Sequence, residues 1–148
     1  MKKAISAAMI LITVMGLTSC KNHPVKKVEK LTDNYAVEHY TVAFPEYSNV
    51  ESETYYVAWE GGLFSSPGPT EPGYRAVVTL EEDAEEIFSE YEWTAVENPQ
   101  FTLELIEVPQ SEEWYMCKQF EKDSFQSVNV NYLYYNGTDT MVFDIHTT

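Results

Sequence analysis

An Asn-Gly pair near the C-terminus constrains the fold more than any other feature. Asn136-Gly137 separates two alternating segments, 128–135 and 140–146, that are rich in Val, Tyr and Phe. Asn-Gly is a strong hairpin signal because both central residues of a type I′ turn need positive φ. Loops of two or four residues both fit and both predict one core face, made of Val128, Val130, Tyr132, Tyr134, Met141, Phe143 and Ile145.

The remaining pattern predicts an α+β fold. Segments rich in β-branched and aromatic residues predict strands at 35–44, 54–60, 74–78, 101–108 and 113–120. One amphipathic helix is predicted over 79–93, where Thr79 and Glu82 fit a capping box ahead of an apolar stripe. We therefore expect an antiparallel sheet of about seven strands with this helix packed on it. A small β-barrel, or a two-layer sheet with a helix lid, is the alternative.

The charge balance excludes one class of partner. From residue 31 onward the chain has 23 acidic residues against Arg75, Lys118 and Lys122, a formal net charge of −20. Such a body repels nucleic acids and anionic surfaces, and it has no basic patch to neutralise phosphates. The acidic run at the start of the predicted helix is most simply a solvated face that complements the helix dipole, and secondarily a site for a basic partner.

The N-terminus has the pattern of an export signal. Lys2 and Lys3 precede an uncharged, mostly apolar run, 4–17, which is too short to span a hydrocarbon core of about 30 Å. Leu17-Thr18-Ser19-Cys20 resembles the lipobox of bacterial lipoproteins. That resemblance implies cleavage before Cys20 and a lipid on its sulfur, which would hold the protein on a membrane of the cell envelope, outside the cytoplasm.

These features divide the chain into three parts. Residues 1–19 are the signal peptide, 20–34 the lipidated cysteine with a basic tether, and 35–148 a single acidic globular domain. The tether holds four lysines, shows no helical or strand periodicity, and is expected to be a flexible coil. Cys117 is then left without a disulfide partner and is expected to be a small buried hydrophobe within a strand.

The long connection 60–73 is the candidate contact site. It holds four of the six glycines and three of the seven prolines, and loops of this length are often functional. Leu63 and Phe64 are expected at its tip, with Trp59 and Tyr74 at its base. The alternative is an Ω-loop whose Leu63 and Phe64 pack back on the core.

The sequence lacks the standard catalytic motifs, and its two candidate metal-binding histidines, His39 and His146, lie on different predicted strands. We therefore expect no cofactor, no metal and no catalytic residue. The leading hypothesis is an envelope lipoprotein that binds a cationic protein or a carbohydrate, for example an inhibitor or immunity-type protein that captures a basic toxin or a lysozyme-like enzyme. A small envelope hydrolase and a purely structural envelope protein are the alternatives.

Overall fold

The computed structural model describes residues 23–60, 71–82 and 84–147. The chain divides into two units, 1–26 with 57–70, and 27–56 with 71–148. The packing and the site described below belong to the second unit.

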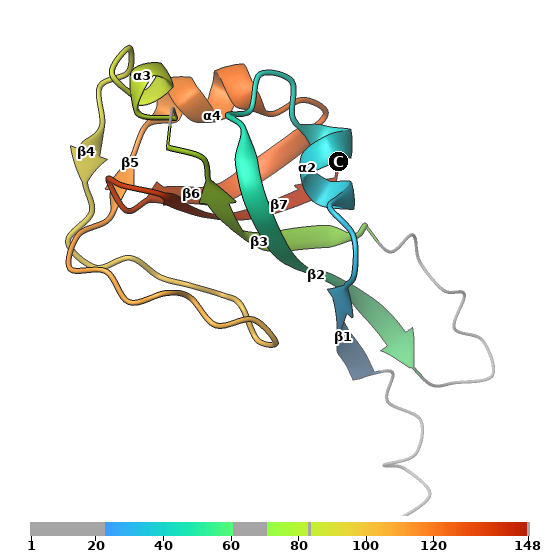
Figure 1. The fold of residues 1–148 in the computed structure, drawn as a ribbon. Helices are drawn as coiled ribbons and strands as arrows, with labels where there is room; N and C mark the ends of the chain where they lie inside the picture. Colours follow the sequence, from blue (N-terminus) through green and yellow to red (C-terminus); the bar gives the residue numbers. More distant parts are fainter. Residues whose placement is uncertain (1–22, 61–70, 83, 148) are drawn as a thin grey trace, which may run out of the picture. The chain divides into compact units, whose positions relative to one another are not determined.

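The fold is α+β, with a seven-stranded, open antiparallel sheet, as the sequence predicts (Figure 1). Its strands lie in the order β1-β2-β3-β7-β6-β5-β4. They are β1 (His23–Leu31), β2 (Tyr47–Glu60), β3 (Gly73–Leu80), β4 (Thr94–Ala95), β5 (Tyr115–Met116), β6 (Val128–Tyr135) and β7 (Thr140–Thr147). The described residues also form three short helices, where the sequence predicted one: α2 (Tyr35–Tyr40), α3 (Ala84–Phe88) and α4 (Lys118–Ser124).

The predicted hairpin is confirmed as β6 and β7, with Gly137 at φ 83°. The Asn136 side-chain oxygen accepts the backbone N–H groups of Thr138, Asp139 and Thr140 at 2.9–3.0 Å, which closes the turn. Next to the turn the register pairs Tyr135 with Met141, which differs from both predicted registers. Farther from the turn Val130 pairs with Ile145, as the four-residue loop predicts. The Asn136 side chain therefore fixes a turn that neither simple loop length describes.

A β-bulge in β6 corrects the predicted core face. The register shifts between Val130 and Tyr132, so two residues there oppose one on β7 and the alternation of side chains reverses. Val128 and Val130 pack against the same core as Met141, as predicted. Tyr132 and Tyr134 instead lie on the other face of the sheet. The prediction was wrong for these two residues because a strict period of two cannot reveal a bulge.

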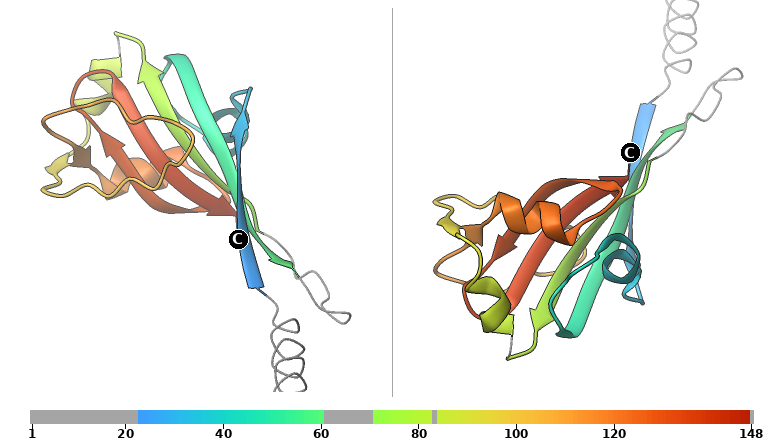
Figure 2. Two further views of the ribbon diagram at one scale, coloured as in Figure 1. Left: turned by 90° about the horizontal axis from the view of Figure 1, so that it is seen from below. Right: turned by 90° about the horizontal axis from the view of Figure 1, so that it is seen from above.

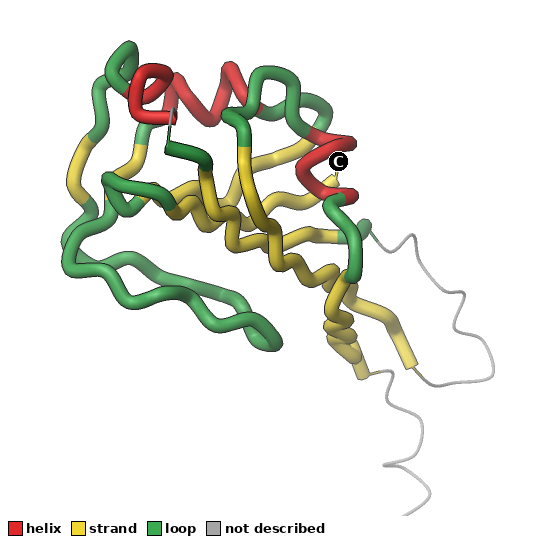
Figure 3. Tube along the Cα trace, viewed as in Figure 1, coloured by secondary structure: helices red, strands yellow, loops and turns green. Residues whose placement is uncertain are grey.

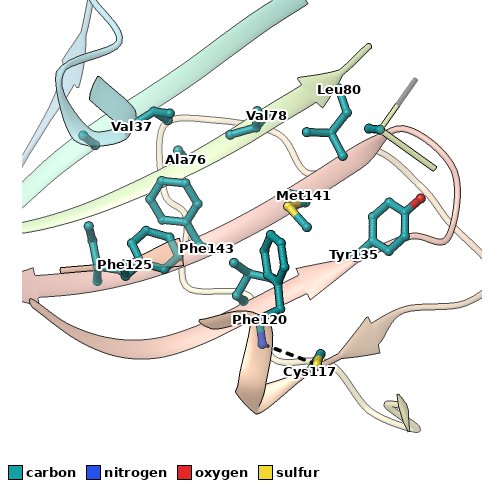
Figure 4. Close-up of a cluster of buried hydrophobic side chains, with 14 of the residues drawn as sticks. Val37, Ala76, Val78, Leu80, Cys117, Phe120, Phe125, Tyr135, Met141 and Phe143 are labelled. Carbon is teal, nitrogen blue, oxygen red and sulfur yellow. Dashed lines mark hydrogen bonds between the residues drawn. The ribbon is translucent and has the colours of Figure 1, made fainter. Parts of the chain in front are cut away.

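The larger core lies between the sheet and the three helices (Figure 2, right). Phe120 of α4 and Phe143 of β7 are at most 1% exposed, and the Phe88 ring stacks on Tyr135 at 4.2 Å. Figure 4 shows Phe120, Tyr135 and Phe143 converging from helix and strands. Each large apolar side chain buried here contributes about 1.5–3 kcal/mol.

The helices depart from the predicted pattern. Segment 35–44, predicted as a strand, begins as α2 instead; Asp33 accepts the Tyr35 N–H at 3.2 Å, and Ala36 and Val37 are buried. The predicted helix 79–93 shrinks to α3, because Thr79 is held in β3 by pairing with Asn49 and Thr140. The apolar stripe is still buried against the sheet, as predicted, since Leu80, Ala84 and Phe88 all belong to the larger core.

Two further strand predictions fail in part or entirely. Segment 113–120 forms only the short β5, because α4 begins directly after Cys117. Cys117 is buried as predicted, but it caps α4 by accepting the Phe120 N–H at 3.5 Å (Figure 4). Segment 101–108 forms no strand. Its side chains pack across the sheet face instead of pairing along its edge.

The predicted coil in 21–34 is also wrong, because His23–Leu31 is β1. This strand lies at the edge of the sheet, where lysine is a common residue because it discourages pairing with other chains. Lys30 contacts Glu51 of β2 at 3.4 Å. Among the described residues, no helix is long and apolar enough to cross a membrane.

Candidate functional site

The predicted contact residues do not form one described site. Trp59 lies within β2, while Leu63, Phe64 and the lipidation candidate Cys20 lie outside the described residues. Tyr74 is half-buried in β3, with its ring centroid 5.3 Å from that of Tyr40. Tyr74 thus belongs to an aromatic cluster beside α2 and packs against the larger core.

The other face of the sheet is covered by residues 96–114, which we call the covering segment. It runs as loop from β4 to β5 on the side opposite the helices (Figures 2 and 3). Trp114 and Ile106 are 5–6% exposed, and they pack with Tyr132, Val77 and Val142 of the sheet. The covering segment therefore packs on a second, smaller apolar core, so both faces of the sheet carry buried side chains.

A row of charged side chains crosses the sheet beneath the covering segment. Glu53 of β2, Arg75 of β3 and Asp144 of β7 are direct register partners, so their side chains share one face. All three are at most 4% exposed. Arg75 donates from Nη1 to Glu53 Oε1 at 3.0 Å and from Nε to Asp144 Oδ2 at 3.1 Å. We call these three residues the charged row.

The charged row holds the covering segment in place. Glu53 accepts the backbone N–H groups of Glu104 at 3.0 Å and Leu105 at 2.7 Å. Thr102 Oγ1 donates to Asp144 Oδ2 at 2.6 Å. Because residues 101–108 have no strand partner, these bonds replace the ladder that would otherwise satisfy the backbone.

Electrostatics reinforce this arrangement. Burial alone lowers the pKa of Arg75, but its bonds to Glu53 and Asp144 outweigh that effect, so its pKa is raised and it stays charged. Tyr55 donates its hydroxyl to Asp144 at 2.7 Å, and its ring lies 4.0 Å from the Arg75 guanidinium carbon. Burial, then the bond to Asp144, raises the pKa of Tyr55, which keeps this hydroxyl a donor.

Gly73 makes room for Tyr55 beside the charged row. The two residues are register partners on β3 and β2. A Cβ at position 73 would lie 2.1 Å from the ring carbon Cζ of Tyr55. Only glycine therefore lets the ring reach both Arg75 and Asp144.

An open groove of about 580 Å³ lies along the covering segment. Phe101 and Trp114 line it, and their ring centroids are 5.2 Å apart. Glu97 and Glu112 are its charged lining residues. Its other lining residues are Val96, Pro99, Val108, Pro109, Gln110 and Ser111. The groove thus combines apolar surface with two carboxylates, a composition suited to binding and orienting a ligand.

Sequence reasoning missed this groove. Predicting strands at 101–108 and 113–120 placed its lining residues Phe101, Val108 and Trp114 in a sheet, where they could not form a separate wall. One signal was present, because Arg75 is the only arginine and lies within an apolar strand of a strongly acidic body. A buried arginine needs carboxylate partners from neighbouring elements, so it could have indicated the charged row.

No group of His, Cys, Asp and Glu in the described part of the chain could hold a metal ion. His39 stacks on Tyr35 with ring centroids 4.9 Å apart, and His146 contacts the Asn129 amide at 3.3 Å. Comparisons with protein-family models, curated proteins and solved structures find no match to this chain.

Proposed function

We propose that the protein is a lipid-anchored binding module of the bacterial cell envelope, exposed outside the cytoplasm, that captures a cationic protein. The observation that carries this proposal is an apolar groove, bearing two carboxylates and no basic lining residue, on a body with a formal net charge of −20. A field of this sign attracts a cationic partner and raises its association rate. The anchor rests on the lipobox-like Leu17-Thr18-Ser19-Cys20 and would leave the acidic body facing its surroundings.

The burial of Trp114 favours a cationic protein over a carbohydrate. A sugar ring binds by lying on the open face of an aromatic side chain. Trp114 is only 5% exposed and is packed on Phe101, so neither of its faces is open. Side chains of a protein partner can instead reach the groove between Phe101 and the glutamates.

The charged row is better explained as structure than as a catalytic pair. Asp144 accepts hydrogen bonds from Arg75, Tyr55, Thr102 and Asn131, and Glu53 accepts from Arg75 and two backbone amides. Carboxylates engaged in this way have little capacity left for a substrate proton. We therefore propose binding, without a chemical step, as the function.

Salt should weaken the interaction with a cationic partner steeply. The lipidated chain in neutral phosphatidylcholine nanodiscs is tested against a panel of cationic proteins, lysozyme among them, by surface-based kinetics. We expect the association rate to fall by at least about tenfold between 0.01 M and 0.15 M salt, as the Debye length shrinks from about 30 Å to about 8 Å.

The matched control is the same cationic partner after succinylation. This modification replaces the positive charges of its lysines with carboxylates and should abolish binding. Equal binding of the native and the succinylated partner, or an association rate that does not change with salt concentration, would contradict the proposal. So would a panel in which no cationic protein binds.

A further inference from the structure

We propose that the groove of the covering segment seats an arginine or lysine of an extended segment of the partner, with its aliphatic stem on the apolar lining and its cationic head between Glu97 and Glu112. This inference rests on the proposed function and adds the site and the type of side chain recognised. The occupant is a basic peptide segment, because the groove offers apolar contact and negative charge together.

Glu97 and Glu112 line the groove from the beginning and the end of the covering segment. The Val96 N–H donates to the Trp114 carbonyl at 2.8 Å, which joins the beginning and the end of the covering segment at that point. Glu97 follows Val96 on one part, and Glu112 precedes Trp114 on the other. Both side chains are exposed, so a cation in the groove can approach two carboxylates at once.

The lining between them suits an aliphatic stem. Besides Phe101 and Trp114, the groove is lined by Val108, Pro99 and Pro109, whose side chains have no hydrogen-bonding groups. Arginine and lysine bury their methylene stems against such surface while the charged head stays near water. A purely acidic or purely apolar segment would match only half of the lining.

The groove is a stable feature because its apolar lining is anchored from below. Phe101 also contacts Tyr134 edge to face, at 5.5 Å between ring centroids. Trp114 is buried with Tyr132 and Val142. Binding therefore needs little ordering of the protein, which favours affinity for a short extended segment.

Calorimetry with two synthetic peptides tests this inference. The probe is a capped octapeptide with two arginines flanked by leucines, and its control has citrulline at both positions, which keeps the shape but removes the charge. At 0.01 M salt we expect the arginine peptide to bind at least about tenfold more tightly, a difference that corresponds to about 1.4 kcal/mol. The double variant Glu97→Gln/Glu112→Gln should bind both peptides equally weakly.

Glu38→Gln/Glu46→Gln is the matched control variant, since it removes the same charge from two exposed glutamates outside the groove. It should keep the preference for arginine within about threefold of wild type, because its only effect is on the long-range field. All variants should keep their thermal midpoints, since every substituted residue is exposed.

Two results would overturn the inference. If both double variants lower the affinity for the arginine peptide equally, the peptide is held by a diffuse charge effect and does not bind in the groove. If a cationic protein binds wild type with the expected salt dependence and binds Glu97→Gln/Glu112→Gln with the same affinity, the proposed function stands and the groove is the wrong site. Failure of every cationic protein to bind would instead reject the proposed function itself.

Discussion

Replacing Arg75 with Met should destabilise the folded protein by about 3–5 kcal/mol, because it leaves the buried carboxylates of Glu53 and Asp144 without their cation. Methionine fills most of the volume of the arginine side chain, so the loss of stability reports the missing charge and not a cavity. Urea unfolding followed by circular dichroism at pH 7 gives the change in the free energy of unfolding.

Lys30→Met is the control for this substitution. The Lys30–Glu51 pair spans 3.4 Å, but both side chains are about half exposed, so its loss should cost at most about 1 kcal/mol. If Arg75→Met costs no more than Lys30→Met, the charged row does not stabilise the fold and the covering segment must be held by other contacts.

Replacing Trp114 with Ala should cost about 3–5 kcal/mol, because it removes the largest side chain of the core beneath the covering segment. It should also weaken binding of the arginine peptide, because Phe101, which lines the groove, packs against Trp114. Circular dichroism during urea unfolding measures the stability, and calorimetry measures the peptide affinity.

Leu105→Ala is the matched control within the same segment. Leu105 is 49% exposed, so its truncation should change stability by no more than about 0.5 kcal/mol. A loss below about 1 kcal/mol for Trp114→Ala would show that the second face of the sheet carries no cooperative core.

The sequence predicts the fold where local signals and burial agree. The Asn136-Gly137 turn and the β6–β7 hairpin follow from turn chemistry and side-chain alternation. The burial of Cys117 follows from the small, apolar character of a free cysteine. Short helices such as α2 were missed because aromatic and β-branched residues favour strands locally. Tertiary packing determines which secondary structure such a segment adopts. Tertiary context thus outweighs propensity wherever a segment is only five to seven residues long.

The candidate groove was beyond sequence reasoning for a different reason. Segment 101–108 is rich in aromatic and branched residues, like a strand, yet its side chains pack on a sheet that has a buried core on both faces. The pairing of Glu53, Arg75 and Asp144 depends on the register of three strands separated by up to 91 positions in the chain. No local pattern encodes that register.

Hydrogen exchange at the amides of Glu104 and Leu105 tests the central claim most directly, namely that the charged row fixes the covering segment and so forms the groove. Both amides lie in a loop, where exchange is normally fast, but both donate to the buried Glu53 carboxylate. By NMR at neutral pH, we predict that they exchange at least about 100-fold more slowly than in an unstructured peptide, and that Arg75→Met removes much of this protection. Exchange of both amides at the unstructured rate in the wild-type protein would contradict the account, because the covering segment would then not be held on the sheet.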